Sequence, residues 1–341
     1  RKEGIYACFP SLTHMPGGRL FANFGTRSRR SHIDNTGGTA RMISEDGGYT
    51  WEPVDKAPDH PRYTREDGTK FVPHARGWVY VDESELPSIK ARNRRWMKAR
   101  PGTVAYLGDP QVAITHPDGK YETLTLDSPV PGGCMSYHHA SSFLRKGDLW
   151  MTAIYCATGT DGMTGVWVIR SEDNAETWEV VHVAGPVGDR HGLGEAALCD
   201  NGQGEIICVM RSGEGGKHNT HQSFSSDGGK TWSAALDTGI WGYPANVILL
   251  SDGRLLCSYG YRRDAMGIRA VLSEDGGHTW DRLNEIVIRA DGHGHGGDNG
   301  YPISVQMDDG HIFTIYYLND KDDVTHVAGT HWTLPQGPGQ F

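Results

Sequence analysis

An eight-residue motif occurs four times in the chain, and it constrains the fold more than any other feature. The copies begin at residues 44, 171, 225 and 273 and share the pattern S-x-D-x-G-x-x-W, with Ala175 replacing the glycine in one copy. Each copy follows a short apolar or β-branched run, which predicts a strand entering a tight turn. The aspartate can accept hydrogen bonds from turn amides, the glycine allows a positive φ, and the tryptophan buries a large ring. We interpret the motif as a structural staple and not as a catalytic site.

The spacing of the motif predicts a β-propeller. The last three copies are 54 and 48 residues apart, and the first step of 127 residues leaves room for a further blade and an insertion. Between the motifs a strand, a Gly-containing hairpin and a second strand recur at 10–24, 246–259 and 302–316, more weakly at 140–155 and 196–210, and in degenerate form at 111–121. A repeat of about 50 residues with several short strands is typical of propellers. Six such phrases predict an all-β, six-bladed β-propeller.

One repeat pattern spans nearly the whole chain, so we expect a single domain over residues 1–341. A stretch at about 52–102 fits no blade and is rich in charge and proline. It is either a solvated or subunit-contacting excursion or a wall over the pocket that contributes an arginine. The last strand, at 324–332, is expected to close against the N-terminal blade.

Composition excludes some classes of protein. A net charge of −9 argues against nonspecific binding to nucleic acid, and the apolar runs are shorter than a membrane span. Most of the six cysteines lie in apolar strand runs, where we expect buried thiols. No spacing is diagnostic of a metal site, and no cofactor is expected. A secreted or periplasmic location is slightly favoured over a cytoplasmic one, and the sequence does not fix the oligomeric state.

Together with the four motifs, four segments resemble the exo-sialidase (neuraminidase) family of glycoside hydrolases. They lie at 29–34, at 191–195 with 209–212, at 258–263 and at 299–302. The resemblance implies that Tyr301 is the nucleophile, Glu195 its base and Asp34 the acid. With an anionic substrate, a neutral tyrosine activated by a glutamate avoids the repulsion that a carboxylate nucleophile would meet. The structural alternatives are a packed tyrosine, an ion pair of Glu195 with Arg211, and a loop aspartate.

The same resemblance implies arginines that bind a sugar carboxylate through their guanidinium forks. Arg211 fits one of these positions, and Arg262 or Arg263 fits another better than Arg269 does. In the first strand, however, Cys8 stands where the family has an arginine. The replacement could come from Arg27, Arg29, Arg30 or the insertion; alternatively, the substrate is not a sialic acid. A second departure is Pro302, where sialidases usually have a serine.

These residues predict a sialidase-like exo-glycoside hydrolase that cleaves a terminal acidic sugar, sialic acid or a related sugar acid, by a retaining mechanism. Its partner would be a glycan or sugar-acid substrate. The 17 histidines leave a second hypothesis open, because His138, His139 and His191 are expected near the same channel mouth. A tyrosine, histidines and an arginine could instead serve a propeller-type polysaccharide lyase acting on a uronate. The third hypothesis is a noncatalytic carbohydrate-binding propeller, since fold does not imply function.

Overall fold

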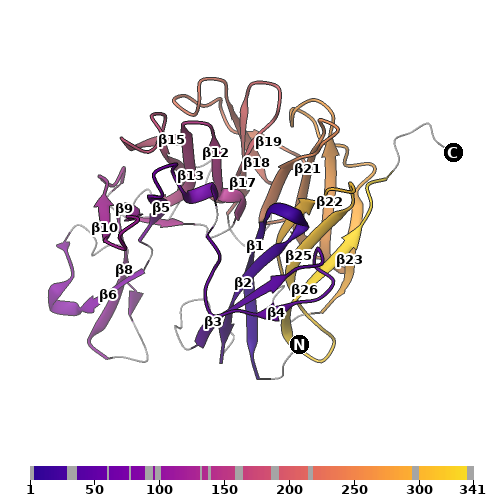
Figure 1. The fold of residues 1–341 in the computed structure, drawn as a ribbon, viewed down its shortest axis with the longest axis horizontal. Helices are drawn as coiled ribbons and strands as arrows, with labels where there is room; N and C mark the ends of the chain where they lie inside the picture. Colours follow the sequence, from indigo (N-terminus) through magenta and orange to yellow (C-terminus); the bar gives the residue numbers. More distant parts are fainter. Residues whose placement is uncertain are drawn as a thin grey trace. The chain divides into compact units, whose positions relative to one another are not determined.

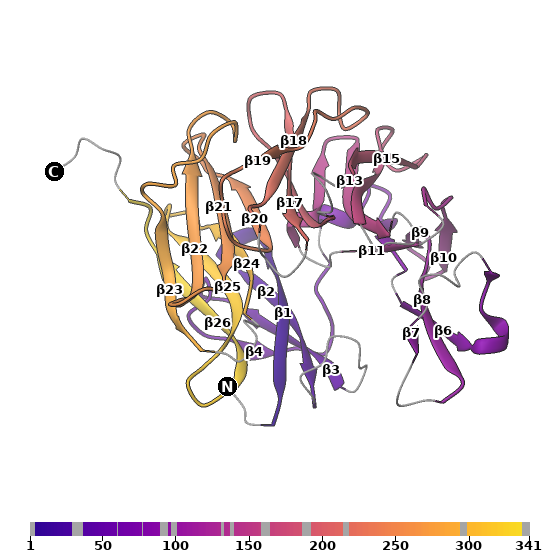
Figure 2. The same ribbon diagram turned by 180° about the vertical axis from the view of Figure 1, so that it is seen from behind.

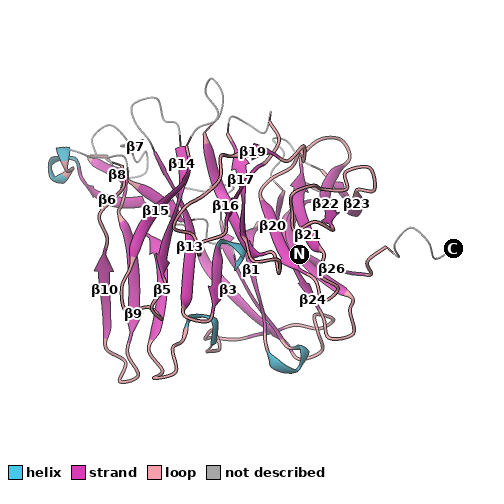
Figure 3. Cartoon of the chain, turned by 90° about the horizontal axis from the view of Figure 1, so that it is seen from above, coloured by secondary structure: helices cyan, strands magenta, loops and turns pink. Residues whose placement is uncertain are grey.

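A computed structural model gives the structure of the protein. It describes residues 4–28, 37–59, 61–76, 78–88, 95–96, 101–130, 133–136, 140–157, 164–185, 192–213, 218–293 and 299–335. Strands dominate these residues, as Figure 3 shows, and the helical segments among them are three-residue 3-10 turns at Pro16–Gly18, Pro61–Tyr63, Glu83–Glu85 and Ala140–Ser142. The prediction of an all-β chain is confirmed. Two compact units divide the chain, one formed by Arg1–Asp59 with Ile240–Phe341 and the other by His60–Gly239.

The first unit contains three antiparallel sheets in which neighbours along the chain pair with each other (Figures 1 and 2). The first sheet has the order β1 (Tyr6–His14), β2 (Leu20–Arg27), β3 (Gly37–Ser44) and β4 (Glu52–Pro53). The second has the order β20 (Ala245–Leu249), β21 (Leu255–Tyr261), β22 (Met266–Ser273) and β23 (Ile286–Gly292). The third has the order β24 (Gly300–Gln306), β25 (Ile312–Asn319) and β26 (Thr325–Trp332).

The second unit contains three further sheets of the same kind and one small extra sheet. The first pairs β9 (Pro110–Thr115) with both β10 (Tyr121–Thr125) and β5 (Lys70–Ala75). The next has the order β11 (Cys134–Ser136), β13 (Leu149–Ala157), β14 (Thr164–Ser171) and β15 (Glu179–Ala184), with β12 (Phe143–Lys146) also on β13. The third has the order β16 (Leu193–Asp200), β17 (Ile206–Ser212), β18 (His221–Ser225) and β19 (Leu236–Asp237). Apolar residues of β13, β14, β16 and β17 form a shared core between the last two sheets.

The stretch at 52–102 differs in part from the expectation that it lies outside the blades. β4 belongs to the first sheet, and β5 pairs with β9 over its whole length. β5 is an edge strand with alternating burial, a position that tolerates Pro73. The remainder forms a separate sheet in which β8 (Thr103–Leu107) pairs with β6 (Trp78–Asp82) and β7 (Arg95–Trp96).

The four motif turns share one hydrogen-bond pattern, which confirms that they are structural staples. In the first turn, Asp46 Oδ1 accepts hydrogen bonds from Ser44 Oγ at 2.8 Å and from the Thr50 amide at 2.8 Å. Its Oδ2 accepts from the Thr50 hydroxyl at 2.6 Å, and Ser44 Oγ accepts from the amide of Gly48. The turns around Asp173, Asp227 and Asp275 repeat these contacts. A single carboxylate thus satisfies several turn donors that no strand can pair.

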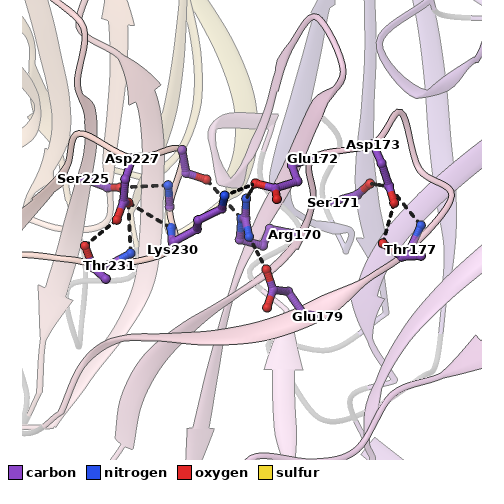
Figure 4. A network of polar contacts seen from close by, with 12 residues as sticks. Arg170, Ser171, Glu172, Asp173, Thr177, Glu179, Ser225, Asp227, Lys230 and Thr231 are labelled. Atoms are coloured by element: carbon purple, nitrogen blue, oxygen red, sulfur yellow. Dashed lines mark hydrogen bonds and ion pairs between the residues drawn. The ribbon is translucent and has the colours of Figure 1, made fainter.

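An ionic network joins two of these turns within the second unit (Figure 4). Arg170 has only 1% of its side chain exposed, and its Nε donates to the carbonyl of Gly228 in the next motif at 3.0 Å. Its other nitrogens contact Glu172 and Glu179, and Lys230 contacts Glu172 at 2.9 Å. The buried guanidinium is therefore paired on several sides, as a buried charge must be. This contact links the third strand of one sheet to the motif turn of the next.

The last strand does not join the N-terminal sheet. β26 is the outer strand of its own sheet and pairs with β25 from Ile312↔Trp332 to Asn319↔Thr325. Side chains make the contact with the first motif turn instead, because the ring of His331 stacks on Tyr49 at a centroid distance of 4.0 Å. The expected closure is thus a side-chain contact and not a shared ladder.

The cysteines match the expectation of buried thiols at four positions and correct it at two. Cys8, Cys199, Cys208 and Cys257 are buried and outside any disulfide. Cys134 and Cys156 form a disulfide, because they lie directly opposite each other on β11 and β13 with Cα atoms 4.1 Å apart. Direct opposition on antiparallel strands brings Cβ atoms within bonding range.

The motif hydrogen bonds predict a specific loss of stability in acid. The hydroxyl and amide of Thr50, followed by Ser44, lower the pKa of Asp46 to about 2. Because the folded pKa lies below the unfolded value of about 3.9, this contribution is full above pH 4 and is lost as the pH falls toward 2. Thr50→Val should make the dependence of the unfolding free energy on pH shallower over that interval, measured by urea denaturation at several pH values. Thr123→Val, which removes an exposed hydroxyl on β10, should leave this dependence unchanged.

Candidate functional site

One position of the repeat is strained in three different sheets. The first strands β1, β16 and β24 each break register at a bulge, between Cys8 and Ser11, Gly194 and Ala196, and Gly300 and Ile303. The first residue inside each bulge is Phe9, Glu195 or Tyr301, with φ values of 53°, 29° and 52°. A positive φ at a non-glycine residue costs on the order of 1–3 kcal/mol, and such residues concentrate at functional sites. Three other non-glycine residues in the described ranges have a positive φ, and all of them lie in turns: Asn174, Ala175 and Asp323.

In the second unit, the bulge of β16 places Glu195 against Arg211 of β17. Arg211 Nη1 donates to Glu195 Oε2 at 2.5 Å, and 15% of the Glu195 side chain and 27% of the Arg211 side chain are exposed. Gly194, the residue before the bulge, is the register partner of Arg211. A half-buried carboxylate held by a guanidinium can accept a proton or orient a hydroxyl group. It can equally serve as a structural ion pair.

In the first unit, the bulge residue Tyr301 packs in an aromatic cluster. Its ring lies 4.7 Å from that of Phe9 and 5.7 Å from that of Tyr317, measured between centroids. The side chain of Tyr301 is 9% exposed, while Phe9 is partly exposed. Arg27, at the end of β2, places its Cζ atom 5.7 Å from the centroid of the Phe9 ring. Tyr301 and Arg27 thus contact the same ring, that of Phe9, which lies on the first strand of this unit.

Two glycines let β21 approach β24 beside Tyr301. A Cβ atom on Gly260 would lie 2.7 Å from the Cα atom of Gly300 and 2.8 Å from the carbonyl oxygen of Tyr243. Gly300 itself has a φ of 123°, a conformation that side chains rarely adopt. Just beyond this contact, Arg262 Nε donates to the carbonyl of Asn299 at 2.8 Å. The end of β21 therefore fixes the backbone that enters Tyr301.

The arginines after β21 stack on aromatic rings. Arg262 lies over Tyr243 at 4.8 Å, and Arg263 lies over Trp241 at 3.6 Å. Arg269 lies over Tyr261 at 3.5 Å and also forms an ion pair with Glu285. The choice of Arg262 or Arg263 as the substrate arginine stays a prediction.

Several predicted site residues lie outside the described residues. They are Asp34, Arg29, Arg30, His138, His139 and His191. The others fall in two groups, because Glu195 and Arg211 belong to the second unit, whereas Tyr301, Arg27, Arg262 and Arg263 belong to the first. Within these units the structure brings Glu195 to Arg211, Tyr301 to Phe9, and Phe9 to Arg27.

Sequence reasoning named Tyr301 but missed the aromatic residues Phe9 and Tyr243. Each of these three residues precedes a proline within or next to a first strand, and this recurrence was the available signal. Cys8 is fully buried, and its thiol carries no positive charge that could bind an anionic ligand. Phe9 instead occupies the repeat position that Glu195 and Tyr301 hold in their sheets.

The described residues contain neither a cluster of metal ligands nor a helix that could span a membrane. Across the described part of the chain, no group of three or more His, Cys, Asp or Glu side chains is arranged to hold a metal ion. Nor does any helix in those ranges have the length and apolar character needed to cross a bilayer.

Comparison with known proteins identifies the family. The model of the BNR repeat-like domain matches residues 128–314, which is more than half of the chain. This protein therefore belongs to the BNR repeat-like family. A search of curated proteins found no match.

Solved structures establish the fold. A protein of unknown function from Dyadobacter fermentans is 24% identical, with a TM-score of 0.75 over 98% of this chain and 96% of its own. The Hadza microbial sialidase Hz136 is 17% identical, with a TM-score of 0.61 over 96% of this chain and 66% of its own. The intramolecular trans-sialidase from Ruminococcus gnavus, solved with oseltamivir carboxylate, is 15% identical, with a TM-score of 0.61 over 96% and 94%. The predicted six-bladed β-propeller with the sialidase fold is confirmed.

The close approach of β21 and β24 predicts a cost for adding one methyl group. Gly260→Ala should lower the unfolding free energy by about 1–3 kcal/mol, because the new Cβ atom meets backbone atoms that cannot rotate away. Urea denaturation measures this cost. Gly38→Ala on β3 is the matched control, since its Cβ atom would meet its nearest neighbour, Thr26 Oγ1, at an ordinary 3.7 Å. Equal stability of the two variants would contradict the contact.

Proposed function

We propose that this protein is a sialidase-like exo-glycoside hydrolase that removes a terminal acidic sugar, sialic acid or a related sugar acid, with retention of configuration. One observation carries the proposal. Glu195 and Tyr301, the residues to which the family resemblance gives the roles of base and nucleophile, occupy the same strained bulge position in two first strands. The bulge fixes the direction in which the side chain leaves the strand, which is what a reactive group requires.

In the proposed reaction, the Tyr301 hydroxyl oxygen attacks the anomeric carbon while its proton passes to the Glu195 carboxylate. The bond from the anomeric carbon to the leaving oxygen breaks as Asp34 protonates that oxygen. Water then attacks the anomeric carbon as Asp34 takes its proton, the bond from that carbon to the Tyr301 oxygen breaks, and Glu195 returns its proton to Tyr301. The contact with Arg211 fixes the position of the Glu195 carboxylate that accepts the proton.

The carboxylate of the substrate would be bound by arginines. Arg211 and Arg262 are proposed as guanidinium donors, and Arg263 as a neighbouring cation. Arg262 is oriented by its hydrogen bond to the carbonyl of Asn299, two residues before Tyr301. A preset guanidinium binds a planar carboxylate at two points and loses little entropy on binding.

Replacement of the tyrosine tests the nucleophile. Tyr301→Phe should lower kcat on an aryl sugar acid by at least about 10³-fold, because no covalent intermediate can form. Release of the aryl group from an aryl α-sialoside and from an aryl uronide measures this rate. Tyr316→Phe is the matched control; it removes a buried hydroxyl that bonds Thr330 at 2.6 Å on the neighbouring strand and should retain turnover.

A covalent adduct would identify the nucleophile directly. A sugar acid fluorinated beside the anomeric carbon should slow both steps and leave its mass on the peptide that contains Tyr301, read by mass spectrometry of the intact and digested protein. Full turnover in Tyr301→Phe, or an adduct on another residue, would refute the assigned role.

A change of the base's partner tests the second unit's contribution. Arg211→Lys keeps the charge but loses the guanidinium fork, so KM for the aryl sugar acid should rise by about 10- to 100-fold. Steady-state kinetics measure the change. Arg254→Lys is the control, because Arg254 contacts Asp252 in an exposed hairpin. A KM as low as that of the control would exclude Arg211 from the substrate site.

A noncatalytic carbohydrate-binding propeller is the second candidate. It is favoured by the buried Cys8, which leaves the first strand without the arginine that sialidases carry there. The same assays separate the two candidates, since a binding protein would bind a sugar acid but release no aryl group from any substrate. A product absorbing in the ultraviolet without added water would indicate a lyase.

A further inference from the structure

We propose that Arg27 of β2 supplies the cation that the first strand lacks at Cys8, and that Phe9 and Gly25 position it beside Tyr301. This inference rests on the proposed function and concerns how its site holds the carboxylate of the substrate. It assigns the missing charge to a neighbouring strand and not to the strand on which the family carries it.

The ladder between β1 and β2 places Arg27 on the required face. Cys8 pairs with Gly25, and Tyr6 pairs with Arg27, so the side chains of Cys8 and Arg27 project from the same face of the sheet. Residues two apart on a strand share a face, and position 25 therefore lies directly between them. A side chain at that position would separate Arg27 from Cys8.

Glycine at position 25 opens this path. A Cβ atom built on Gly25 would lie 3.8 Å from Arg27 Nε and 3.8 Å from Cys8 Sγ. The guanidinium of Arg27 therefore already lies over the glycine, close to the sulfur of Cys8. The guanidinium of Arg27 thus lies beside the side chain of residue 8, the position at which the sialidase family has an arginine.

Phe9 defines the other side of the arginine. The Arg27 Cζ atom lies 5.7 Å from the centroid of the Phe9 ring, within the range of a cation–π contact. The same ring contacts Tyr301 edge-on at 4.7 Å. One aromatic ring thus contacts both the cation and the proposed nucleophile.

Binding measurements in a variant without turnover test the assignment. In the Tyr301→Phe background, the affinities for N-acetylneuraminic acid and D-glucuronic acid are compared with those for their uncharged methyl esters by isothermal titration calorimetry. Arg27→Gln should weaken binding of the acid by about tenfold or more and leave binding of the ester unchanged, because only the acid offers an anionic partner. Gly25→Val should have the same effect, since its side chain blocks the path of Arg27.

Controls separate this effect from a loss of folding. Arg254→Gln removes a cation from an exposed hairpin and should leave both affinities unchanged. Phe9→Leu keeps the bulk but removes the aromatic face, and it should weaken binding of the acid less than Arg27→Gln does. Far-ultraviolet circular dichroism and urea denaturation show whether each variant is folded.

The failures of the two proposals differ. If Arg27→Gln binds the acid as tightly as its parent, or loses acid and ester equally, Arg27 does not hold the carboxylate, while the hydrolase proposal stands. If the unsubstituted protein releases no aryl group from any sugar acid and the Tyr301→Phe protein binds neither acid, both the hydrolase proposal and the role of Arg27 are wrong.

Discussion

The carboxylates of the motif aspartates hold the turns at one end of four sheets, and in two of these sheets the first strand carries a strained bulge toward the opposite end. Ser44, which begins the first motif, lies level with Leu20 and His14 in the ladders. Phe9 lies near the opposite end of β1, where Cys8 pairs with Gly25. The same separation holds in β16, where Glu195 lies near one end and Asp200 lies at the other. Asp200 pairs with Ile206, which pairs with Ser225 at the start of the next motif. Hydrogen bonds at the stapled end therefore offset distortion at the bulged end.

The parts of the fold that the sequence predicted are those coded by local chemistry. The motif around Asp46 is recognisable because all its contacts lie within seven residues of chain. The strand β5 was missed because its ladder partner β9 follows it in the sequence only after the strands of the extra sheet, β6, β7 and β8. The disulfide between Cys134 and Cys156 was missed for a related reason, since their opposition depends on the register of β11 on β13.

The site shows the same division. The spacing of Glu195 and Arg211 on consecutive strands was enough to propose that they meet, and the structure pairs them. A bulge cannot be read from spacing, because it is defined by the residue that the partner strand skips. The positive φ of Phe9, Glu195 and Tyr301 therefore appeared only with coordinates, although the aromatic–proline pairs at Phe9 and Tyr301 hinted at a shared position. Asp34 stays a prediction, because it lies outside the described residues.

Glycines explain how one site geometry can be built from different sequence positions. Gly260 and Gly300 bring two strands into backbone contact beside Tyr301, and Gly25 lets the side chain of Arg27 cross to Cys8. A binding site constrains where a guanidinium group lies, and it does not constrain the strand from which the side chain starts. Under the proposed assignment, the cation that β1 lacks at position 8 comes from β2, across a position that has no side chain. A motif search that expects the cation at position 8 finds Cys8 instead. The pairing of β1 with β2 shows that Arg27 lies on the same face of the sheet as Cys8.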